Sequence, residues 1–333
     1  MKDTFKALVV REEEGQVQCK VEEVSQEFLS PGHVLVKVAY SSVNYKDMLA
    51  VQTKGGVIRS YPMIPGIDFS GWVVSDSSGS YDQGDRVLLT GFDVGMTHTG
   101  GFAEYAQVPK EWLVPCPKDL GLKEAMIMGT AGFTAALSIA ELEAKGMAED
   151  KDKAILVTGA TGGVASIGIQ LLKASGYKNI HALTRKSSQV KTLENLGANC
   201  VHLAEDLIPE KPRLLAKQVF HYVLDVVGGS VASGLLPQIH YGGAMSMCGN
   251  AAGISLSTSV MPFILRGISL LGVDSVNYPM KNRYAIWDRF SKDWHIMDQS
   301  MIKEISLDQL SEAFSQLKQG SHVGRYIVKI TEE

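Results

Sequence analysis

The chain has 333 residues, 45% of them hydrophobic, and a formal net charge of −4 at pH 7. This length suits two globular domains, and the slightly acidic balance argues against nucleic acid as a main partner. No run of about 18 apolar residues could span a membrane, and the first residues lack the apolar core of a signal peptide. The four cysteines form no Cys-x-x-Cys pair, which fits a reducing compartment, so we expect a cytoplasmic protein with no membrane partner.

The first part of the chain predicts a mostly β domain. Short strand-like runs alternate with glycine and proline turn signals such as Pro65-Gly66 and Gly84-Asp85. Many short strands separated by such signals are typical of all-β domains. The predicted strands are Val34–Val43, Gly71–Ser75 and Arg86–Thr90.

A glycine-rich turn between a strand and a helix is the most informative segment. The apolar run Ala154–Thr158 has strand length, and from Val164 the apolar residues recur at helical spacing. Glycines between them would leave backbone N–H groups and the positive helix end open to a phosphate, because a Cβ would block close approach. An ordinary tight turn is the alternative. The predicted phosphate cradle comprises Thr158, Gly159, Thr161, Gly162, Gly163 and Val164.

Strand-like and helical runs continue to alternate beyond this turn. Such alternation predicts a parallel sheet covered by helices on both faces, the doubly wound α/β architecture of a dinucleotide-binding domain. The further predicted strands are Ile180–Thr184, Asn199–Leu203, Tyr222–Val226, Ala244–Met247 and Ser269–Val273, and the predicted helices include Ser188–Leu196 and Ser230–Gln238.

The segment after the second predicted strand indicates which dinucleotide is bound. NAD-specific folds carry an acidic residue about 20 residues beyond the glycines, where it holds the ribose hydroxyls. Here Thr184, Arg185, Lys186 and Ser188 occupy that region, and no acid occurs before Glu194. Two charge-assisted hydrogen bonds to a 2′-phosphate would favour NADP by on the order of a hundredfold. We therefore expect NADP(H), with a solvated basic helix start as the alternative.

The last part of the chain predicts a helix over Leu307–Lys318 and a strand over Gly324–Ile330. A single helix and strand need a sheet to join, and the simplest arrangement returns them to the first domain. The predicted domains are therefore 1–127 with 275–333, and 128–274.

Several motifs spread over the whole chain carry a family resemblance. Together they resemble the medium-chain dehydrogenase/reductase family, among its quinone oxidoreductase-like members and most closely their acrylyl-CoA reductase branch. This resemblance implies a Rossmann domain combined with a mostly β GroES-like catalytic domain, and a homodimer paired through the sheet edge near Leu270. The motifs are Ser42-Val43-Asn44-Tyr45-Lys46-Asp47, Pro65-Gly66-Ile67-Asp68-Phe69-Ser70-Gly71, Gly84-Asp85-Arg86-Val87, Gly100–Tyr105, Gly129–Ala135, Cys248-Gly249, Leu271–Val276 and Gly324-Arg325.

The chain departs from the zinc-dependent members of that family. Those members have a cysteine in the first motif and Gly-His-Glu in the second, where this chain has Asn44 and Gly66-Ile67-Asp68. Residues 92–112, where a structural-zinc lobe is expected, contain no cysteine. Without thiolates or a suitable histidine neither zinc site can form, so we expect no metal.

The resemblance also implies roles for individual residues. Tyr45 is the candidate proton donor or oxyanion ligand, Asn44 a neutral donor that orients substrate or the nicotinamide ribose, and Asp47 a group that orients its neighbours. Arg325 would contact a cofactor phosphate or support the cleft, with a surface salt bridge as the alternative. Arg283, in a basic cluster with Lys281 and Arg289, would bind the phosphates of a CoA thioester, with a solvated helix face as the alternative. The remaining implied cofactor contacts are Thr134, Gly249, Asn250, Ser275 and Val276.

These expectations lead to three functional hypotheses for a small-molecule substrate. The first is a zinc-independent, NADPH-dependent reductase of the C=C bond of an α,β-unsaturated thioester, turning acrylyl-CoA into propionyl-CoA. The second is an NADPH oxidoreductase of quinones or free α,β-unsaturated ketones. The third is a non-catalytic NADPH sensor, against which the polar residues at positions 44–47 argue.

Overall fold

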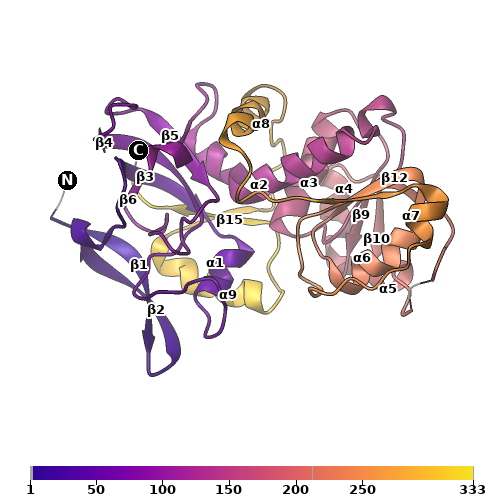
Figure 1. Cartoon of the computed structure of the whole chain (residues 1–333), viewed down its shortest axis with the longest axis horizontal. Helices are drawn as coiled ribbons and strands as arrows, with labels where there is room; N and C mark the ends of the chain where they lie inside the picture. Colours follow the sequence, from indigo (N-terminus) through magenta and orange to yellow (C-terminus); the bar gives the residue numbers. More distant parts are fainter. Residues whose placement is uncertain (1–2, 212, 333) are drawn as a thin grey trace. The chain divides into compact units, whose positions relative to one another are not determined.

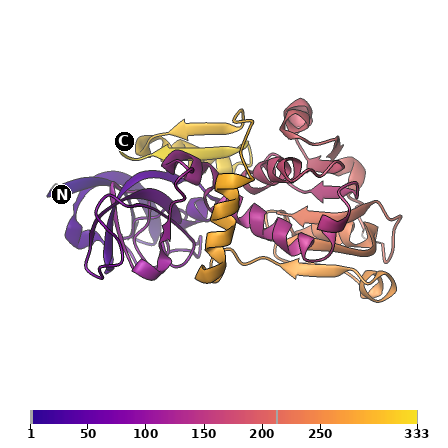
Figure 2. The ribbon, with the colours of Figure 1, turned by 90° about the horizontal axis from the view of Figure 1, so that it is seen from above.

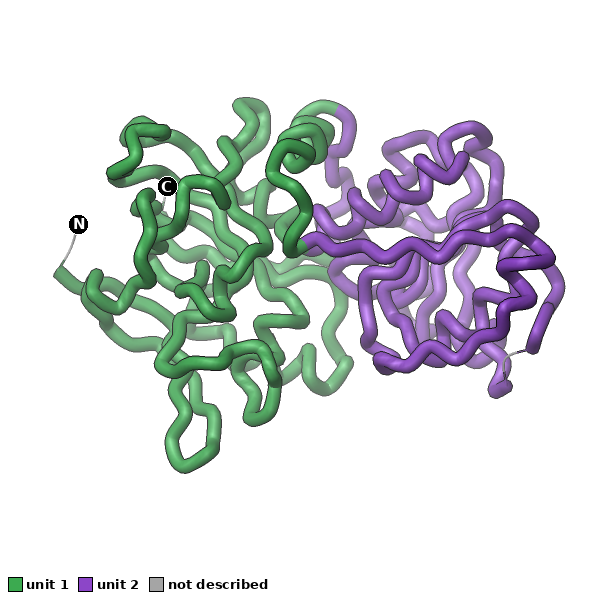
Figure 3. The backbone as a smooth tube through the Cα atoms, viewed as in Figure 1, with its two compact units in different colours: residues 1–130, 276–292, 301–333 green, residues 131–275, 293–300 purple. Residues whose placement is uncertain are grey.

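The computed structural model describes residues 3–211 and 213–332, and Figure 1 labels the helices and strands. The chain divides into two units, the first comprising residues 1–130, 276–292 and 301–333, the second residues 131–275 and 293–300 (Figure 3). The domain limits inferred from the sequence stay a prediction.

The second unit contains a six-stranded sheet in the order β10-β9-β8-β11-β12-β13. All neighbouring strands pair in parallel. The chain fills the sheet outward from β8 in one direction and then from β11 in the other, so the predicted doubly wound parallel sheet is confirmed. The strands are β8 (Ile155–Val157), β9 (Ile180–Thr184), β10 (Cys200–Leu203), β11 (Phe220–Asp225), β12 (Ile239–Met247) and β13 (Ser269–Gly272).

Helices connect these strands because parallel neighbours need a crossover. The core between sheet and helices includes Leu156, Val223, Leu235 and Met245, all fully buried. The predicted helix over 188–196 begins with a 3-10 turn, Ser187–Gln189, and the one over 230–238 ends with another, Leu236–Gln238. The helices are α3 (Gly163–Ala174), α4 (Val190–Leu196), α5 (Ala204–Leu207), α6 (Gly229–Leu235) and α7 (Met261–Arg266).

The first unit contains a seven-stranded, mostly antiparallel sheet in the order β14-β15-β3-β4-β5-β7, with β6 pairing β3. Only β14 and β15, side by side in Figure 2, pair in parallel. This confirms the predicted β domain and the return of the C-terminal strand to it. The elements are β3 (Val34–Ser42), α1 (Tyr45–Ala50), β4 (Asp68–Asp76), β5 (Arg86–Thr90), β6 (Tyr105–Val108), β7 (Val114–Pro115), α8 (Met280–Lys292), β14 (Ile302–Ile305), α9 (Leu310–Lys318) and β15 (Arg325–Lys329).

The register of this sheet brings three polar residues together. Strand β3 ends at Ser42, β4 begins at Asp68, and β15 begins at Arg325. Ser41 pairs with Phe69 across β3 and β4, and Ser42 pairs with Ile327 across β3 and β15. Strand ends from distant parts of the sequence therefore meet at one edge of the sheet.

An antiparallel hairpin of β1 (Thr4–Glu13) and β2 (Gln16–Ser25) was not predicted. Its turn residues Glu14 and Gly15 have φ of 50° and 76°. Positive φ at both central positions is the signature of a type I′ turn, which matches the twist of the two strands. The usual asparagine or aspartate is replaced by glutamate, so the turn signal in the sequence was weak.

Helix α2 (Leu122–Glu143) runs from the first unit into the second and is interrupted at Gly129, whose φ is 49°. By length and composition α2 could cross a membrane, and it is the one described helix of which this is true. Its apolar window is 89% buried in the protein, which is typical of a core helix.

Candidate active site

Asp68 is the centre of a buried polar network in the first unit. Its carboxylate accepts hydrogen bonds from Ser42 N at 3.0 Å, Ser42 Oγ at 2.8 Å, Asn44 Nδ2 at 2.9 Å and Thr130 N at 2.8 Å. The side chain is fully buried. A buried carboxylate requires such a set of donors because it has lost its water.

Arg325 supplies the positive charge of this network. Its Nη2 donates to Ser42 Oγ at 2.8 Å and its Nη1 to Asn44 Oδ1 at 3.2 Å, while Nε donates to the carbonyl of Ile127 at 3.3 Å. Arg325 is only 2% exposed, and burial lowers its pKa while Asp68 and Asp47 raise it. Both the expected surface salt bridge and the expected phosphate contact are therefore wrong, because the guanidinium is enclosed and committed to protein oxygens.

A kink allows Arg325 to come this close. A Cβ at Gly129 would lie 2.7 Å from both Arg325 Nη2 and Ser42 Oγ, and 3.0 Å from Asp68 Oδ2. The positive φ of Gly129 is also unfavourable for any other residue. Glycine at this position thus shapes the network.

Asn44 links the two charges. Its Nδ2 donates to Asp68 and to the carbonyl of Ser42 at 3.2 Å, and its Oδ1 accepts from Arg325. These partners fix the orientation of the amide. Both amide hydrogens are used inside the protein. The expected role of Asn44, to orient substrate or the nicotinamide ribose, stays a prediction.

Asp47 is also buried and holds the turn that carries Asn44. Its Oδ2 accepts from Asn44 N at 2.8 Å, and its Oδ1 accepts from Ile67 N at 3.0 Å. Burial, followed by the charge of Asp68, raises the pKa of Asp47 to about 7. These contacts suit a group that orients its neighbours, and the side chain is not accessible to a substrate.

Tyr45 differs from the residues around it because it faces solvent. It is the first residue of α1 and is 48% exposed. Within the described part of the chain, its hydroxyl has no hydrogen-bond partner. The one phenol on this turn is therefore accessible while the polar groups beside it are occupied.

The predicted phosphate cradle lies in the second unit. Gly162, with φ of −84° and ψ of 166°, precedes α3, and the first turn of this helix carries no acidic residue and no side-chain cap. Gly159 has a φ of 58°, and a Cβ there would lie 2.8 Å from Val227 Cγ2. A twelve-residue helix with an uncapped glycine start leaves backbone donors for an anion. This geometry fits the pyrophosphate of a dinucleotide.

The side chain of Thr158 forms hydrogen bonds with the end of β11 and does not line the cradle. Its Oγ1 donates to Asp225 Oδ1 at 2.7 Å and accepts from Val226 N at 3.0 Å, and its N–H donates to the carbonyl of Leu224. The side chain is fully buried, and the expected contact of Thr158 with the cofactor stays a prediction. Sequence reasoning missed Asp225, although an acid that ends a buried apolar strand was a usable signal.

The segment after β9 keeps its basic residues accessible. Arg185 and Ser188 are exposed, and Lys186 is partly buried. The buried Thr184 accepts from Lys186 N at 3.0 Å, which fixes the turn. Burial, and secondly Arg185, lowers the pKa of Lys186. An anion placed between the two cations would relieve their repulsion.

The other implied cofactor residues fall into two groups. Thr134 Oγ1 donates to Ser275 Oγ at 2.8 Å within the second unit. The carbonyl of Val276, in the first unit, accepts from Phe92 N and from Arg283 Nη2. Gly249 follows β12, and a Cβ there would lie 2.1 Å from the carbonyl oxygen of Val226, so only glycine fits. Asn250, Thr161, Gly163 and Val164 lie at the same carboxyl edge of the sheet, and their contacts with a cofactor stay predictions.

Comparisons with known proteins agree with this architecture. A model for the alcohol dehydrogenase GroES-like domain matches residues 30–118, and one for the zinc-binding dehydrogenase family matches residues 163–292. The "Putative quinone oxidoreductase YhfP" of Bacillus subtilis is 43% identical over 333 residues, which cover 99% of this chain and 100% of that protein. The chain belongs to the medium-chain dehydrogenase/reductase family.

Further relatives and solved structures resemble this chain over almost its full length. The acrylyl-CoA reductase AcuI of Ruegeria pomeroyi is 39% identical, with 98% of this chain and 99% of that protein covered. The crystal structure of the YhdH oxidoreductase of Salmonella enterica in complex with NADP has a TM-score of 0.94 at 40% identity, covering 98% of this chain and all of that one. The structure of Bacillus subtilis YhfP with NAD bound has a TM-score of 0.94 at 42% identity, covering 99% and 100%.

The zinc of other medium-chain dehydrogenases/reductases does not fit the donors of this chain. Asn44 offers an amide, Ile67 offers no ligand atom, and the Asp68 carboxylate already accepts from several donors. Zinc sites in proteins are built from thiolates, imidazoles and accessible carboxylates. The side chains of Asn44 and Asp68 are committed to the network around Arg325, so no step of the chemistry is assigned to a metal.

The expected substrate contact by Arg283 is wrong. Arg283 in α8 is fully buried, and it donates to the carbonyls of Thr90 at 2.8 Å, Val276 at 2.8 Å and Tyr278 at 2.9 Å. Its guanidinium also lies 4.5 Å from the ring centre of Phe92. The arginine therefore ties α8 to β5 and leaves no donor for a CoA phosphate. Of the expected basic cluster, Lys281 is exposed and Arg289 is partly buried.

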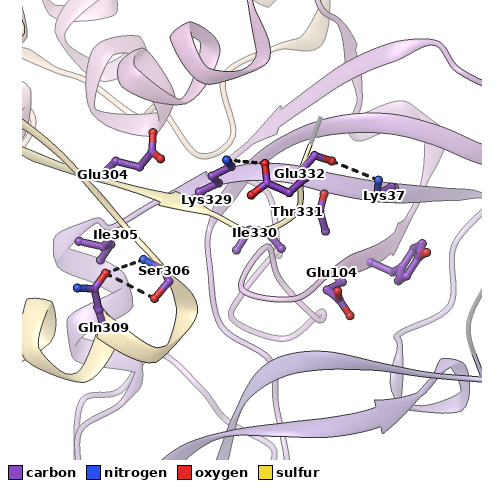
Figure 4. Close-up of a pocket in the computed structure, with 11 residues that line it drawn as sticks. Lys37, Glu104, Glu304, Ile305, Ser306, Gln309, Lys329, Ile330, Thr331 and Glu332 are labelled. Atoms are coloured by element: carbon purple, nitrogen blue, oxygen red, sulfur yellow. Dashed lines mark hydrogen bonds and ion pairs between the residues drawn. The ribbon is translucent and has the colours of Figure 1, made fainter.

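A separate hollow of about 720 Å³ lies in the first unit (Figure 4). Its rim carries both signs of charge, with Lys329 Nζ 2.7 Å from Glu332 Oε2 and Lys37 Nζ donating to the Glu332 carbonyl at 3.4 Å. None of the predicted site residues lines it. We assign it no role in the chemistry.

Proposed function

We propose that this protein is an NADPH-dependent, zinc-independent reductase that transfers hydride to the C=C bond of an α,β-unsaturated thioester, with acrylyl-CoA as substrate and propionyl-CoA as product. The observation that carries the proposal is the accessible phenol of Tyr45 beside a buried charge network whose side chains are paired with one another. The named activity of the acrylyl-CoA reductase from Ruegeria pomeroyi supports the choice of substrate.

The proposed chemistry needs two groups besides a hydride. Addition of hydride to the β-carbon moves negative charge to the thioester oxygen, and a proton must then reach the α-carbon. We assign Tyr45 to one of these tasks, either as hydrogen-bond donor to the oxygen or as proton donor. Asn44, Asp47, Asp68 and Arg325 position the turn that presents Tyr45.

NADP(H) is proposed as the cofactor, and it supplies the hydride when bound. The glycine cradle before α3 would hold the pyrophosphate through backbone N–H groups. Arg185 and Lys186 would pair with the 2′-phosphate, and Ser188 would donate to it. The NADP complex of the Salmonella enterica relative supports this choice. YhfP has been crystallised with NAD, so NADPH and NADH should be compared directly.

The second candidate is reduction of quinones or free α,β-unsaturated ketones. The burial of Arg283 favours it, because it removes one cation from the group expected to bind CoA phosphates. The name of YhfP, a quinone oxidoreductase, also supports this second candidate. Both reactions could use the same phenol, so the substrate distinguishes them.

The deciding experiment follows NADPH oxidation by absorbance, with acrylyl-CoA and a soluble quinone in parallel and NADH as cofactor control. We expect rapid oxidation with acrylyl-CoA and slow oxidation with quinone. Oxidation with quinone alone would establish the second candidate in place of the first. Tight NADPH binding without turnover of either substrate would identify a sensor.

Replacing Tyr45 by phenylalanine is expected to reduce turnover with acrylyl-CoA by about 10²–10⁴-fold, the usual contribution of a positioned acid. The Kd for NADPH should change by less than about threefold, because the ring stays and only the hydroxyl is removed. Single-turnover kinetics and NADPH fluorescence titration measure the two effects. Unchanged turnover would exclude Tyr45 as proton donor and leave that task to solvent.

A homodimer is proposed to form through β13. This strand is the edge of the six-stranded sheet and so presents unpaired backbone groups. Exposed apolar side chains also occur on α7 and just before it, namely Val260, Ile264 and Leu265. Analytical ultracentrifugation is expected to give twice the 36.1 kDa of one chain. A Leu270→Pro variant, which cannot complete edge pairing, should sediment as a monomer, and a monomeric parent protein would refute the proposal.

A further inference from the structure

We propose that His181, Cys200 and His202 form a binding site for one late first-row transition-metal ion, with zinc as the preferred ion. The site lies in the second unit, on strands β9 and β10, and none of its three residues is among those to which we assign cofactor or substrate binding. Two imidazoles and a thiolate are the donors that select zinc and its neighbours over magnesium or calcium.

The sheet places the three side chains on one face. Cys200 and His181 are directly paired across the parallel strands β10 and β9. His202 lies two residues beyond Cys200 on β10, and residues two apart on a strand point to the same face. The three ligand atoms lie within 4.8 Å of one another. Around tetrahedral zinc such atoms are roughly 3.3–3.8 Å apart, so small side-chain rotations complete the site.

Hydrogen bonds already set the protonation of the first ligand. Asn179 Nδ2 donates to the carbonyl of Asp152 at 3.2 Å, which turns Asn179 Oδ1 toward His181. His181 Nε2–H donates to that oxygen at 2.8 Å, so His181 Nδ1 is the unprotonated nitrogen. A metal-bound histidine normally donates its other N–H to an oxygen in this way.

The two imidazoles now share the proton that a metal would replace. His181 Nδ1 lies 2.9 Å from His202 Nε2, and it accepts the hydrogen bond from that nitrogen. If the proton of His202 moves to its Nδ1, both facing nitrogens become ligands without any change of charge. Burial lowers the pKa of both histidines, and His202 adds to the effect on His181. His181, whose Nδ1 accepts a hydrogen bond, is a neutral ring, as a ligand must be.

Cys200 provides the third donor and leaves the site open. Its side chain is exposed, so an ion can enter from solvent and a water molecule can complete four-coordination. Phe220 packs edge-on against His181 and His202 with ring centres 5.4 and 5.8 Å away, and it closes the apolar side. Binding of a metal releases one proton, from the thiol.

A second histidine pair in the same sheet gives a matched control. His221 in β11 and His240 in β12 stack with ring centres 4.0 Å apart. Over the described ranges, this pair belongs to no group of three metal-ligating side chains. It resembles the first pair in its ring contact and differs in lacking a cysteine.

Metal binding would fix the edge strand β10 more firmly to its neighbour β9. Strand β10 is an edge strand held by β9 alone. His181 and Cys200 lie at the amino-terminal ends of their strands, whereas the Thr184–Ser188 segment follows the carboxyl end of β9. A metal would therefore fasten the edge strand without taking part in hydride transfer.

The test titrates the full-length, reduced and chelator-treated protein with Co²⁺, whose thiolate charge-transfer absorption reports a sulfur ligand. We expect one Co²⁺ per chain, displacement by Zn²⁺, and a thermal unfolding midpoint that rises with Zn²⁺. Cys200→Ser should abolish the charge-transfer band. His202→Gln should weaken binding at least about tenfold, a loss that even outer-shell changes cause.

His240→Gln is the control and should bind as the parent protein does. Circular dichroism of each variant separates a lost ligand from a lost fold. The proposal is overturned if no thiolate band appears, or if Cys200→Ser and His202→Gln both bind Co²⁺ as tightly as the parent protein. NADPH oxidation by Cys200→Ser without metal should equal that of the parent, so the result is independent of the proposed reductase activity.

Discussion

Replacing Arg325 by methionine is expected to lower the free energy of unfolding by about 3–5 kcal/mol. The reason is the environment of Asp68 and Asp47, two fully buried carboxyl groups whose neighbouring cation the substitution removes. Methionine approximates the volume of the aliphatic stem, so the loss reports mainly the charge and its hydrogen bonds. Urea unfolding followed by tryptophan fluorescence and circular dichroism measures it.

The control is Arg11→Met. Arg11 forms a salt bridge with Glu22 at 3.0 Å, but its side chain is 41% exposed. A solvent-exposed pair contributes only about 0–1 kcal/mol, so this variant should unfold almost as the parent protein does. Equal losses for the two variants would contradict the view that Arg325 compensates buried negative charge.

Replacing both Arg185 and Lys186 by alanine is expected to reduce the preference for NADPH over NADH by on the order of a hundredfold. The change should appear as a weaker Kd for NADPH with the Kd for NADH almost unchanged, because only NADP carries the 2′-phosphate. Direct fluorescence titration of each cofactor with each protein measures the four constants.

Lys191→Ala is the matched control for this pair. Lys191 lies one turn further along, and its ammonium is highly exposed and pairs with Glu194 at 3.1 Å. Its loss removes one positive charge from the same region without removing a group assigned to the phosphate. If Lys191→Ala lowered NADPH affinity as much as the double variant, general electrostatic attraction would explain the preference instead of specific contacts.

Much of the fold followed from local patterns. The strand–glycine–helix segment around Gly162 and the alternation after it predicted the parallel sheet, because period and turn chemistry are properties of neighbouring residues. Strand limits shifted by one or a few residues; for example, the strand predicted over 244–247 begins at Ile239. The turn that carries Tyr45 was likewise predictable, because the Asn44-Tyr45-Lys46-Asp47 motif spans the start of α1.

The burial of charged residues could not be predicted in the same way. Arg325 and Arg283 look like ordinary basic residues in the sequence, and both are enclosed by carbonyl oxygens contributed by distant segments. Whether a cation faces solvent or a buried acid depends on tertiary pairing, which no local window contains. The same holds for Cys200 and His181, which become neighbours only when β9 and β10 pair.

The route of the chain also constrains when this protein can become active during its synthesis. The strand that begins with Arg325 pairs with β3, so the first unit stays incomplete until residues 325–329 have been made. The second unit needs residues 293–300 as well, although most of it is synthesised much earlier. The second unit, whose last residue is 300, can therefore be complete before β15 of the first unit has been synthesised. A nascent chain that stops before β15 would hold Asp68 without its compensating charge.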